Sequence, residues 1–382
     1  MLDTAPPLPE SPAADSRAVP KPRLPGRDRV WVLDGLRLGA ALMVVAYHYM
    51  AIGGKWEHGA KSVFPTVSLP SAYGWMGVEL FFMISGFVIC MSCWGKSLGD
   101  FFVSRVIRIY PAYWFAIALT TAVVIAFPGG VMRRNWDEIL TNLTMLQGPL
   151  NARDVDAVYW TLGSELHFYL MFAVVVWRGV TYRKVVLFAL LWAMASATFA
   201  KFDDSPVKQF IMPEYSWYFI AGMMFYLMYR FRPNLLLLGI VAACYVVSQR
   251  FALNTLEDVR ENVGLNVPQW PVPVILAVFF AVFLLIATHR LSWITWGWLP
   301  ALGALTYPLY LLHEYIGWEI IAKFQGRVNA GVLVGALVAG MLILSWLVNR
   351  LIEKPMSGWL RGHMIRSLAD LRGMAESARQ GR

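Results

Sequence analysis

The chain of 382 residues is 58% hydrophobic, 14% aromatic and 15% charged, whereas about 25% of the residues in soluble domains are charged. Together with a mean hydropathy of +0.53, this composition excludes an ordinary soluble enzyme and indicates a chain embedded in lipid. The net charge of +9 does not require a nucleic-acid partner, because basic residues in a membrane protein more often set its orientation.

Residues 1–29 contain seven prolines and no apolar periodicity, a pattern that predicts a disordered tail. A transmembrane helix needs about 20 mostly apolar residues, and ten segments of roughly this length follow the tail. These segments are 30–52, 74–94, 111–127, 158–177, 184–200, 214–229, 234–248, 271–288, 298–316 and 330–349. The sequence therefore predicts an all-α polytopic membrane protein with about ten transmembrane helices.

Lys and Arg are distributed unevenly between the loops that these segments define. The side that holds both termini has 21 of them and the other side has 11, and the more basic side faces the cytoplasm. We therefore expect both termini in the cytoplasm and a multi-pass protein of the cell (inner or plasma) membrane. The transmembrane domain is expected to cover 30–355, and the basic tail 356–382 is expected to form a cytoplasmic amphipathic helix.

Two ionisable residues lie inside the first predicted helix. Arg37 and His48 are eleven residues apart, which corresponds to three turns plus about 20°, and to about 16 Å along the axis. Both side chains are therefore predicted on one face, with Arg37 in the cytoplasmic half and His48 near the outer surface. Ionisable groups inside a span are costly and mark functional sites by default.

Further polar side chains are predicted inside other spans, most of them in the outer third. They are Glu79 and, near mid-helix, Ser85 in the second helix, Glu165 and His167 in the fourth, and His313 and Glu314 in the ninth. Glu165 is too short to reach the interface, which favours a functional role. His167 and His313 have an equally simple interpretation as interfacial side chains whose polar tips lie among lipid headgroups.

Arg105 and Arg108 lie three residues apart before the third predicted helix, so they share a helix face at the cytoplasmic boundary. They are either positive-inside anchors or a paired-guanidinium site for phosphates, which Arg binds through two parallel hydrogen bonds. Phosphate affinity inside and a His/Glu cluster outside favour a phosphate-bearing donor that reaches outward through the protein.

The motifs that carry these residues resemble those of the acyltransferase 3 family of integral membrane acyltransferases. They are LDGLRLGAALMVVAYHY, GVELFFMISGFVI, Arg105-x-x-Arg108 with IYPAYW, WTLGSELHFYL, TYPLYLLH and IEKP, in this order between residues 33 and 355. The family often has Asp where this chain has Glu79. The resemblance implies a ten-helix core that transfers an acyl group, often acetyl, from cytoplasmic acyl-CoA to a hydroxyl group.

The resemblance also implies roles for individual residues. His48 and Glu165 are expected to be catalytic, with His48 as general base or acyl carrier and Glu165 orienting or charging it. Arg37, Arg105, Arg108 and Ser85 are expected to bind acyl-CoA, while Glu79, His167 and His313 are expected on the acceptor side. We expect no metal and no cofactor, because acyl-CoA is a co-substrate.

The acceptor is expected to be a hydroxyl of a surface glycan, a lipid-linked glycan or a glycosylated natural product. Two other classes of function remain open at this point. A transporter or flippase with a polar pathway requires no chemistry, although the two halves show no internal symmetry. A scaffolding protein leaves the ionisable residues Arg37 and Glu165 within the spans without a purpose.

Overall fold

The computed structural model of the chain describes residues 29–52, 56–127, 133–202 and 205–380, and none of these residues forms a strand. The predicted all-α fold class is confirmed. The predicted disordered tail, residues 1–29, lies outside the described residues except for Arg29. The helical unit begins at Trp31.

The helices of the unit divide into long ones and short connecting ones. The long ones are α1 (Trp31–Ala46), α4 (Gly77–Cys93), α5 (Leu98–Ala126), α7 (Trp160–Trp177), α8 (Tyr182–Phe199), α10 (Ser216–Phe231), α11 (Leu235–Val263), α12 (Pro271–Ala287), α13 (Leu299–Leu312), α14 (Glu314–Phe324), α15 (Ala330–Val348) and α16 (Lys354–Gln380). The short ones are η1 (Tyr47–Ala51), α2 (Gly59–Val63), α3 (Ser68–Ser71), η2 (Gly74–Met76), α6 (Trp136–Asn142), η3 (Ala157–Tyr159), α9 (Pro206–Ile211) and η4 (Asn349–Glu353).

Each of the ten predicted segments contains a helix, but two helices are longer than hydropathy indicates. α5 begins at Leu98, runs through Pro111 and has Ser97 as its N-cap, whose hydroxyl accepts the Asp100 N–H. α11 continues to Val263 and ends at Gly264, which adopts the left-handed conformation that suits glycine. Charged residues interrupt the apolar pattern in both extensions, which include Asp100, Arg105 and Arg108 in α5 and Glu257, Asp258 and Arg260 in α11.

Within the described residues, six helical runs are long and apolar enough to cross a membrane, and α12 and α13 are shorter apolar helices. The chain is therefore polytopic. Because length and composition alone underlie this number, the count of ten spans and the cytoplasmic location of both termini stay predictions.

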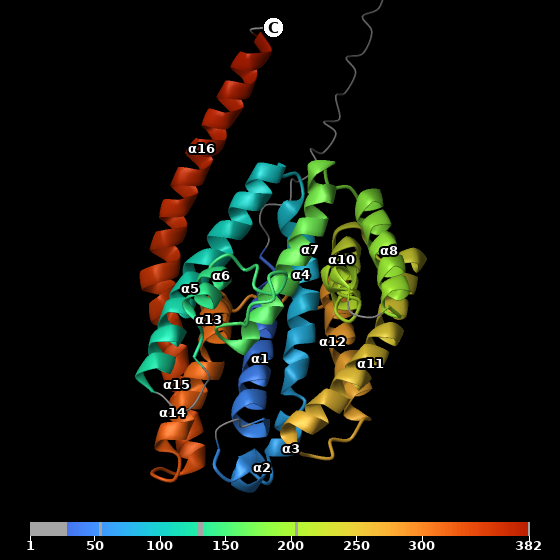
Figure 1. Ribbon diagram of the computed structural model, residues 1–382. Helices are drawn as coiled ribbons and strands as arrows, with labels where there is room; N and C mark the ends of the chain where they lie inside the picture. The colour runs from blue at the N-terminus through green and yellow to red at the C-terminus, as the bar shows by residue number, and fades with distance from the viewer. Residues whose placement is uncertain (1–28, 53–55, 128–132, 203–204, 381–382) are drawn as a thin grey trace, which may run out of the picture. The chain divides into compact units, whose positions relative to one another are not determined.

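α1 and α4 lie in the middle of the view in Figure 1, with α8 and α10–α12 on one side and α5 and α13–α16 on the other. α10 packs against α4, α11 and α12, while α1 packs against α13 and α4. Glycines allow the α4–α10 contact: a Cβ on Gly222 would lie 2.1 Å from the Met83 carbonyl oxygen, and one on Gly86 would lie 2.2 Å from that of Phe219. Small residues at helix interfaces permit such approach of the backbones.

The C-terminal residues predicted as an amphipathic helix are helical. α15 continues through the π-helical turn η4 into α16, which extends beyond the neighbouring helix ends in Figure 1. α16 packs against α5, and the Ser357 hydroxyl donates to the Ile107 carbonyl at 2.7 Å. Its location on a membrane surface stays a prediction.

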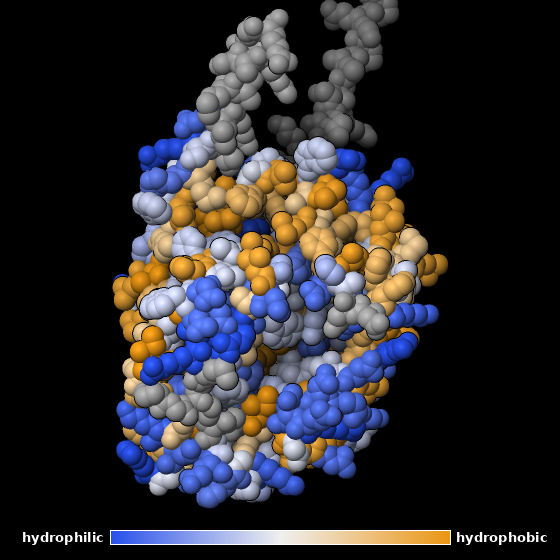
Figure 2. Space-filling model, in the orientation of Figure 1, coloured by the Kyte–Doolittle hydropathy of each residue, from blue (hydrophilic) through white to orange (hydrophobic). Residues whose placement is uncertain are grey.

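Apolar side chains cover much of the upper and right parts of the face shown in Figure 2, where α7 and α8 lie. Hydrophilic side chains gather in the lower half of this face, beside α6 and the C-terminal half of α11. An apolar surface over long helices is what a lipid environment requires.

Candidate active site

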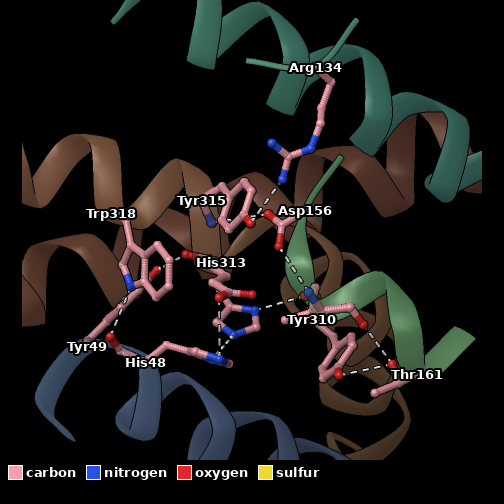
Figure 3. Close-up of polar contacts among 11 residues, drawn as sticks. His48, Tyr49, Arg134, Asp156, Thr161, Tyr310, His313, Tyr315 and Trp318 are labelled. Carbon is pink, nitrogen blue, oxygen red and sulfur yellow. Dashed lines mark hydrogen bonds and ion pairs between the residues drawn. The ribbon is translucent and has the colours of Figure 1, made fainter. Parts of the chain in front are cut away.

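Two histidines from distant parts of the sequence meet inside the helical unit (Figure 3). His48 lies in η1, the π-helical turn that follows α1, and His313 is the residue between α13 and α14. His48 Nδ1 lies 2.9 Å from His313 Nε2, which is a hydrogen-bond distance. π-helical turns are rare and often occur at functional sites, so this contact is a candidate centre for chemistry.

The backbone of both histidines is held by aromatic side chains. The Tyr49 hydroxyl donates to the His313 carbonyl at 2.6 Å, and the Trp318 indole N–H donates to the His48 carbonyl at 3.1 Å. Gly317 leaves room for Tyr49, since a Cβ on this glycine would lie 2.3 Å from the Tyr49 hydroxyl oxygen. The backbone of each histidine is therefore held by a side chain from the other chain segment.

Two buried carboxyl groups lie beside the histidines. Glu314 Oε1 is 3.7 Å from His48 Nε2, and Asp156 accepts the N–H of Val158 at 3.3 Å. Asp156, which precedes the span that begins at Ala157, also accepts the Tyr315 N–H at 3.1 Å. Burial raises the pKa of Asp156 above its ordinary value.

A cavity lies among α1, α4, α5, α7 and α13. Five side chains that the sequence assigned to catalysis or the donor line it, namely Arg37, Ser85, Arg105, Arg108 and Glu165. The structure therefore brings together residues from four helices, including three guanidinium groups. A cluster of guanidinium groups in a concave site is suited to an anionic ligand such as a phosphate.

Protein groups orient two of these guanidinium groups. Arg37 donates to Asp34 at 3.1 Å, and Arg105 donates to the Ser92 hydroxyl at 3.3 Å. The Arg105 guanidinium carbon also lies 5.9 Å and 5.7 Å from the ring centres of Phe101 and Tyr169. Asp34 forms an ion pair with Arg37, whereas the contacts of Arg105 with neutral groups hold its guanidinium in place and leave its charge available to a ligand.

Glu165 does not lie against His48, although the sequence argument paired them. Its Oε1 accepts the Ser85 hydroxyl at 2.6 Å in the cavity wall, whereas the carboxyl that lies 3.7 Å from His48 Nε2 is that of Glu314. The difference arises because His48 faces the α13–α14 junction, while α7 presents Glu165 to α4. No local sequence pattern encodes which helices face each other.

Tyr310 connects the cavity with the histidine pair. Its side chain lines the cavity, its hydroxyl lies 3.0 Å from Thr161 Oγ1, and its ring centre is 5.7 Å from that of His313. Neither His48 nor His313 lines the cavity. The Tyr310 side chain thus forms the part of the cavity wall that is nearest to the histidines.

The remaining two candidates lie away from the cavity. Glu79 is buried in α4, and its Oε2 is without a hydrogen-bond partner in the described part of the chain. The His167 ring lies 5.2 Å from the Phe210 ring, centre to centre. Neither residue lines the cavity or contacts the histidine pair within the described residues.

The sequence placed Glu314 beside His313 at the outer end of the ninth helix without a separate role, and it did not single out Asp156 or Tyr310. The position of Asp156 directly before an apolar run was an available signal. Glu314 follows His313 in the chain, so its proximity was visible, but its contact with His48 is decided by tertiary packing.

The helices and the buried polar groups define an integral membrane protein with an arginine-lined internal cavity. The chain belongs to the acyltransferase family, because the family's acyltransferase domain matches residues 30–350. It is thus a membrane enzyme of the acyltransferase class, as the resemblance of the motifs implied.

Curated relatives are consistent with this membership. The chain is 28% identical over 321 residues to the exopolysaccharide production protein ExoZ of Rhizobium meliloti (strain 1021), covering 79% of this chain and 95% of ExoZ. It is 29% identical over 173 residues to the acyltransferase MdmB of Streptomyces mycarofaciens, covering 43% and 42% of the two chains. Nodulation protein 10 of Rhizobium leguminosarum bv. viciae is 30% identical over 166 residues, covering 38% and 44%.

The match to MdmB thus spans less than half of that relative, while the match to ExoZ spans nearly all of it. No solved structure shows a significant match to this chain.

Proposed function

We propose that the protein transfers an acyl group, in the simplest case acetyl, from cytoplasmic acyl-CoA to a hydroxyl of a sugar-containing acceptor. The observation that carries this proposal is the position of Arg37, Arg105 and Arg108 around one cavity that ends at Tyr310, next to the histidine pair. This arrangement places a binding site for an anion and a candidate base within one membrane domain.

The donor site follows from the cavity. Arg105 and Arg108 bind the nucleotide phosphates at the cytoplasmic end, and Arg37 neutralises negative charge of the donor further along the path. Arg37 and His48 are about 16 Å apart along an ideal helix, a length that an extended pantetheine arm spans. Glu165 holds the Ser85 hydroxyl and so acts on the donor rather than on His48.

His48 is the general base of the proposed reaction. It takes the proton of the acceptor hydroxyl, and the acceptor oxygen attacks the carbonyl carbon of the thioester. The C–O ester bond forms, the C–S bond breaks, and the proton passes from His48 to the CoA thiolate. Because Tyr310 separates the cavity from the histidines, its side chain must move for the thioester to reach the base.

The acceptor assignment is supported by relatives. ExoZ, which aligns over most of both chains, is named for exopolysaccharide production, and this name favours a glycan hydroxyl as the acceptor. A base near the outer surface would meet a glycan that is presented outside the membrane.

Purified protein in nanodiscs, incubated with labelled acetyl-CoA and a glycan extract, tests the proposal. We expect release of CoA and transfer of label to a base-labile product. Label retained on the protein without an acceptor would indicate an acyl-histidine intermediate in place of direct transfer. No CoA release and no labelled product with any acceptor would contradict the proposal and favour a transporter.

A further inference from the structure

The hydrogen bonds of His313 determine which of its ring nitrogens carries the proton. His313 Nδ1 lies 2.8 Å from the Tyr310 carbonyl oxygen, and a carbonyl oxygen only accepts hydrogen bonds. Nδ1 of His313 is therefore protonated. In the neutral ring, the other nitrogen, Nε2, then carries a lone pair and accepts.

The tautomer of His48 follows from that of His313. His313 Nε2 lies 2.9 Å from His48 Nδ1, and because Nε2 accepts, Nδ1 of His48 must donate. The neutral His48 ring therefore has its free lone pair on Nε2. This nitrogen faces the carboxyl of Glu314, whose Oε1 lies 3.7 Å away.

Contacts on several sides hold His313 in the position that fixes the tautomer of His48. The residue is fully buried and lies where α13 gives way to α14, at a point where the last carbonyls of a helix need other partners. The His313 ring donates a hydrogen bond to one such carbonyl, that of Tyr310. The backbone carbonyl of His313 accepts the Tyr49 hydroxyl. A ring fixed on both sides cannot readily turn towards a substrate.

We infer that His313 is a positioning residue that holds His48 in the Nδ1–H tautomer, so that His48 Nε2 is the nitrogen that takes the acceptor proton. The part concerning the acceptor proton rests on the proposed function, whereas the tautomer rests on the geometry alone. His313 thus takes the place that a carboxylate has beside the histidine of a hydrolase triad. It replaces the acceptor-side role expected from the sequence.

When Nε2 takes the proton, His48 becomes an imidazolium that keeps its Nδ1–H bond to His313. The carboxyl of Glu314 lies beside the new N–H and stabilises its charge. The catalytic proton moves only between the acceptor, His48 Nε2 and the CoA thiolate.

The tautomer is testable without any activity. Full-length protein with ¹⁵N-labelled histidine in nanodiscs is measured by nitrogen NMR at a pH where the rings are neutral, and His48→Asn identifies the His48 signals by their loss. We expect His48 and His313 protonated at Nδ1. Protonation of neutral His48 at Nε2 in the wild-type protein would overturn the inference.

Two substitutions of His313 separate positioning from simple loss of packing. His313→Gln retains an amide oxygen that can accept the His48 Nδ1–H, whereas His313→Leu has no acceptor. We expect His48 to stay in the Nδ1–H form in the first variant and to lose it in the second. His363→Gln, on exposed α16, is the matched control and leaves His48 unchanged.

Kinetics of the same variants supply the second readout. His313→Leu should lower kcat about 10²-fold or more with little change in the KM for acetyl-CoA, while His313→Gln should recover much of this loss. Equal losses in the two variants, with both folded, would overturn the positioning role. If no variant and not even the wild type transfers acetyl groups but the NMR result holds, the proposed function fails and the tautomer stands.

Discussion

At the scale of single residues, the polar groups of the candidate site form two sets, for which we propose different tasks. The cavity set contains Arg37, Arg105 and Glu165, and the histidine set contains His48 and His313. A substitution in the first set should change how the donor binds, and one in the second should change the proton transfer. This difference makes the two assignments separately testable.

Replacing His48 with Asn should lower acetyl transfer about 10² to 10⁴-fold, because the proton acceptor is lost. The Asn amide still presents a donor to His313, so folding should be preserved. CoA release by the variant in nanodiscs measures the effect, and gel filtration checks its dispersity. His363→Asn is the control, and turnover near the wild-type rate in the His48 variant would remove this residue from the mechanism.

Replacing Arg105 with Gln should raise the KM for acetyl-CoA about 10 to 100-fold, as expected for loss of a hydrogen bond to a charged group. The kcat should change little, because the phosphates are far from the thioester. The variant should also lose the preference for acetyl-CoA over acetyl-pantetheine, which lacks the nucleotide phosphates. An unchanged preference would favour the anchor interpretation, and Arg183→Gln, outside the cavity, serves as control.

At the scale of helices, close backbone contacts determine where the side chains of α4 are presented. α4 carries Ser85 to the cavity and is held against α10 by two glycines. The interruption of α13 and α14 at His313 has a corresponding effect, since it directs the histidine side chain back to the Tyr310 carbonyl. Irregularities of helices thus position the reactive groups.

Gly222→Ala should destabilise the protein by about 1 to 3 kcal/mol, the usual cost of overpacking. Its Cβ would lie 2.1 Å from the backbone oxygen of Met83, so the α4–α10 pair must separate. Thermal unfolding in detergent measures the change. Gly239→Ala on α11, where a Cβ meets nothing within 4 Å, is the matched control, and equal stability of the two variants would contradict the expected clash.

At the scale of the whole molecule, the proposed reaction requires a donor and an acceptor on opposite sides of the membrane. The predicted cytoplasmic location of both termini is therefore part of the proposed mechanism. The excess of basic residues on one side supports this orientation, and accessibility of single cysteines tests it.

In a variant without the native Cys90, Cys93 and Cys244, a cysteine is introduced at Ser97 or at Asn151. A membrane-impermeant maleimide added to intact cells should label the Asn151→Cys protein and leave the Ser97→Cys protein unlabelled. Permeabilised cells should show labelling of both, which controls for accessibility. Labelling of the Ser97 variant in intact cells would reverse the predicted orientation.

The sequence by itself determined the helical membrane class, the approximate helix positions and the arginines of the cavity, because hydropathy and helical periodicity are properties of local segments. It also identified Arg105, Arg108, Ser85 and Glu165, which proved to line one cavity. The sequence did not predict the start of α5 or the end of α11, since charged and polar residues continue these helices beyond their apolar segments.

Only the tertiary structure decided which residues are neighbours of His48. The sequence paired His48 with Glu165, whereas the fold places His48 against His313 and Glu314. His313 is 265 residues further along the chain than His48. The physical reason is that a helix pattern states which face is apolar, not which other helix that face meets. The packing of α1 against α13 and the interrupted helix at His313 set the partner of the base, and with it the tautomer that the reaction needs.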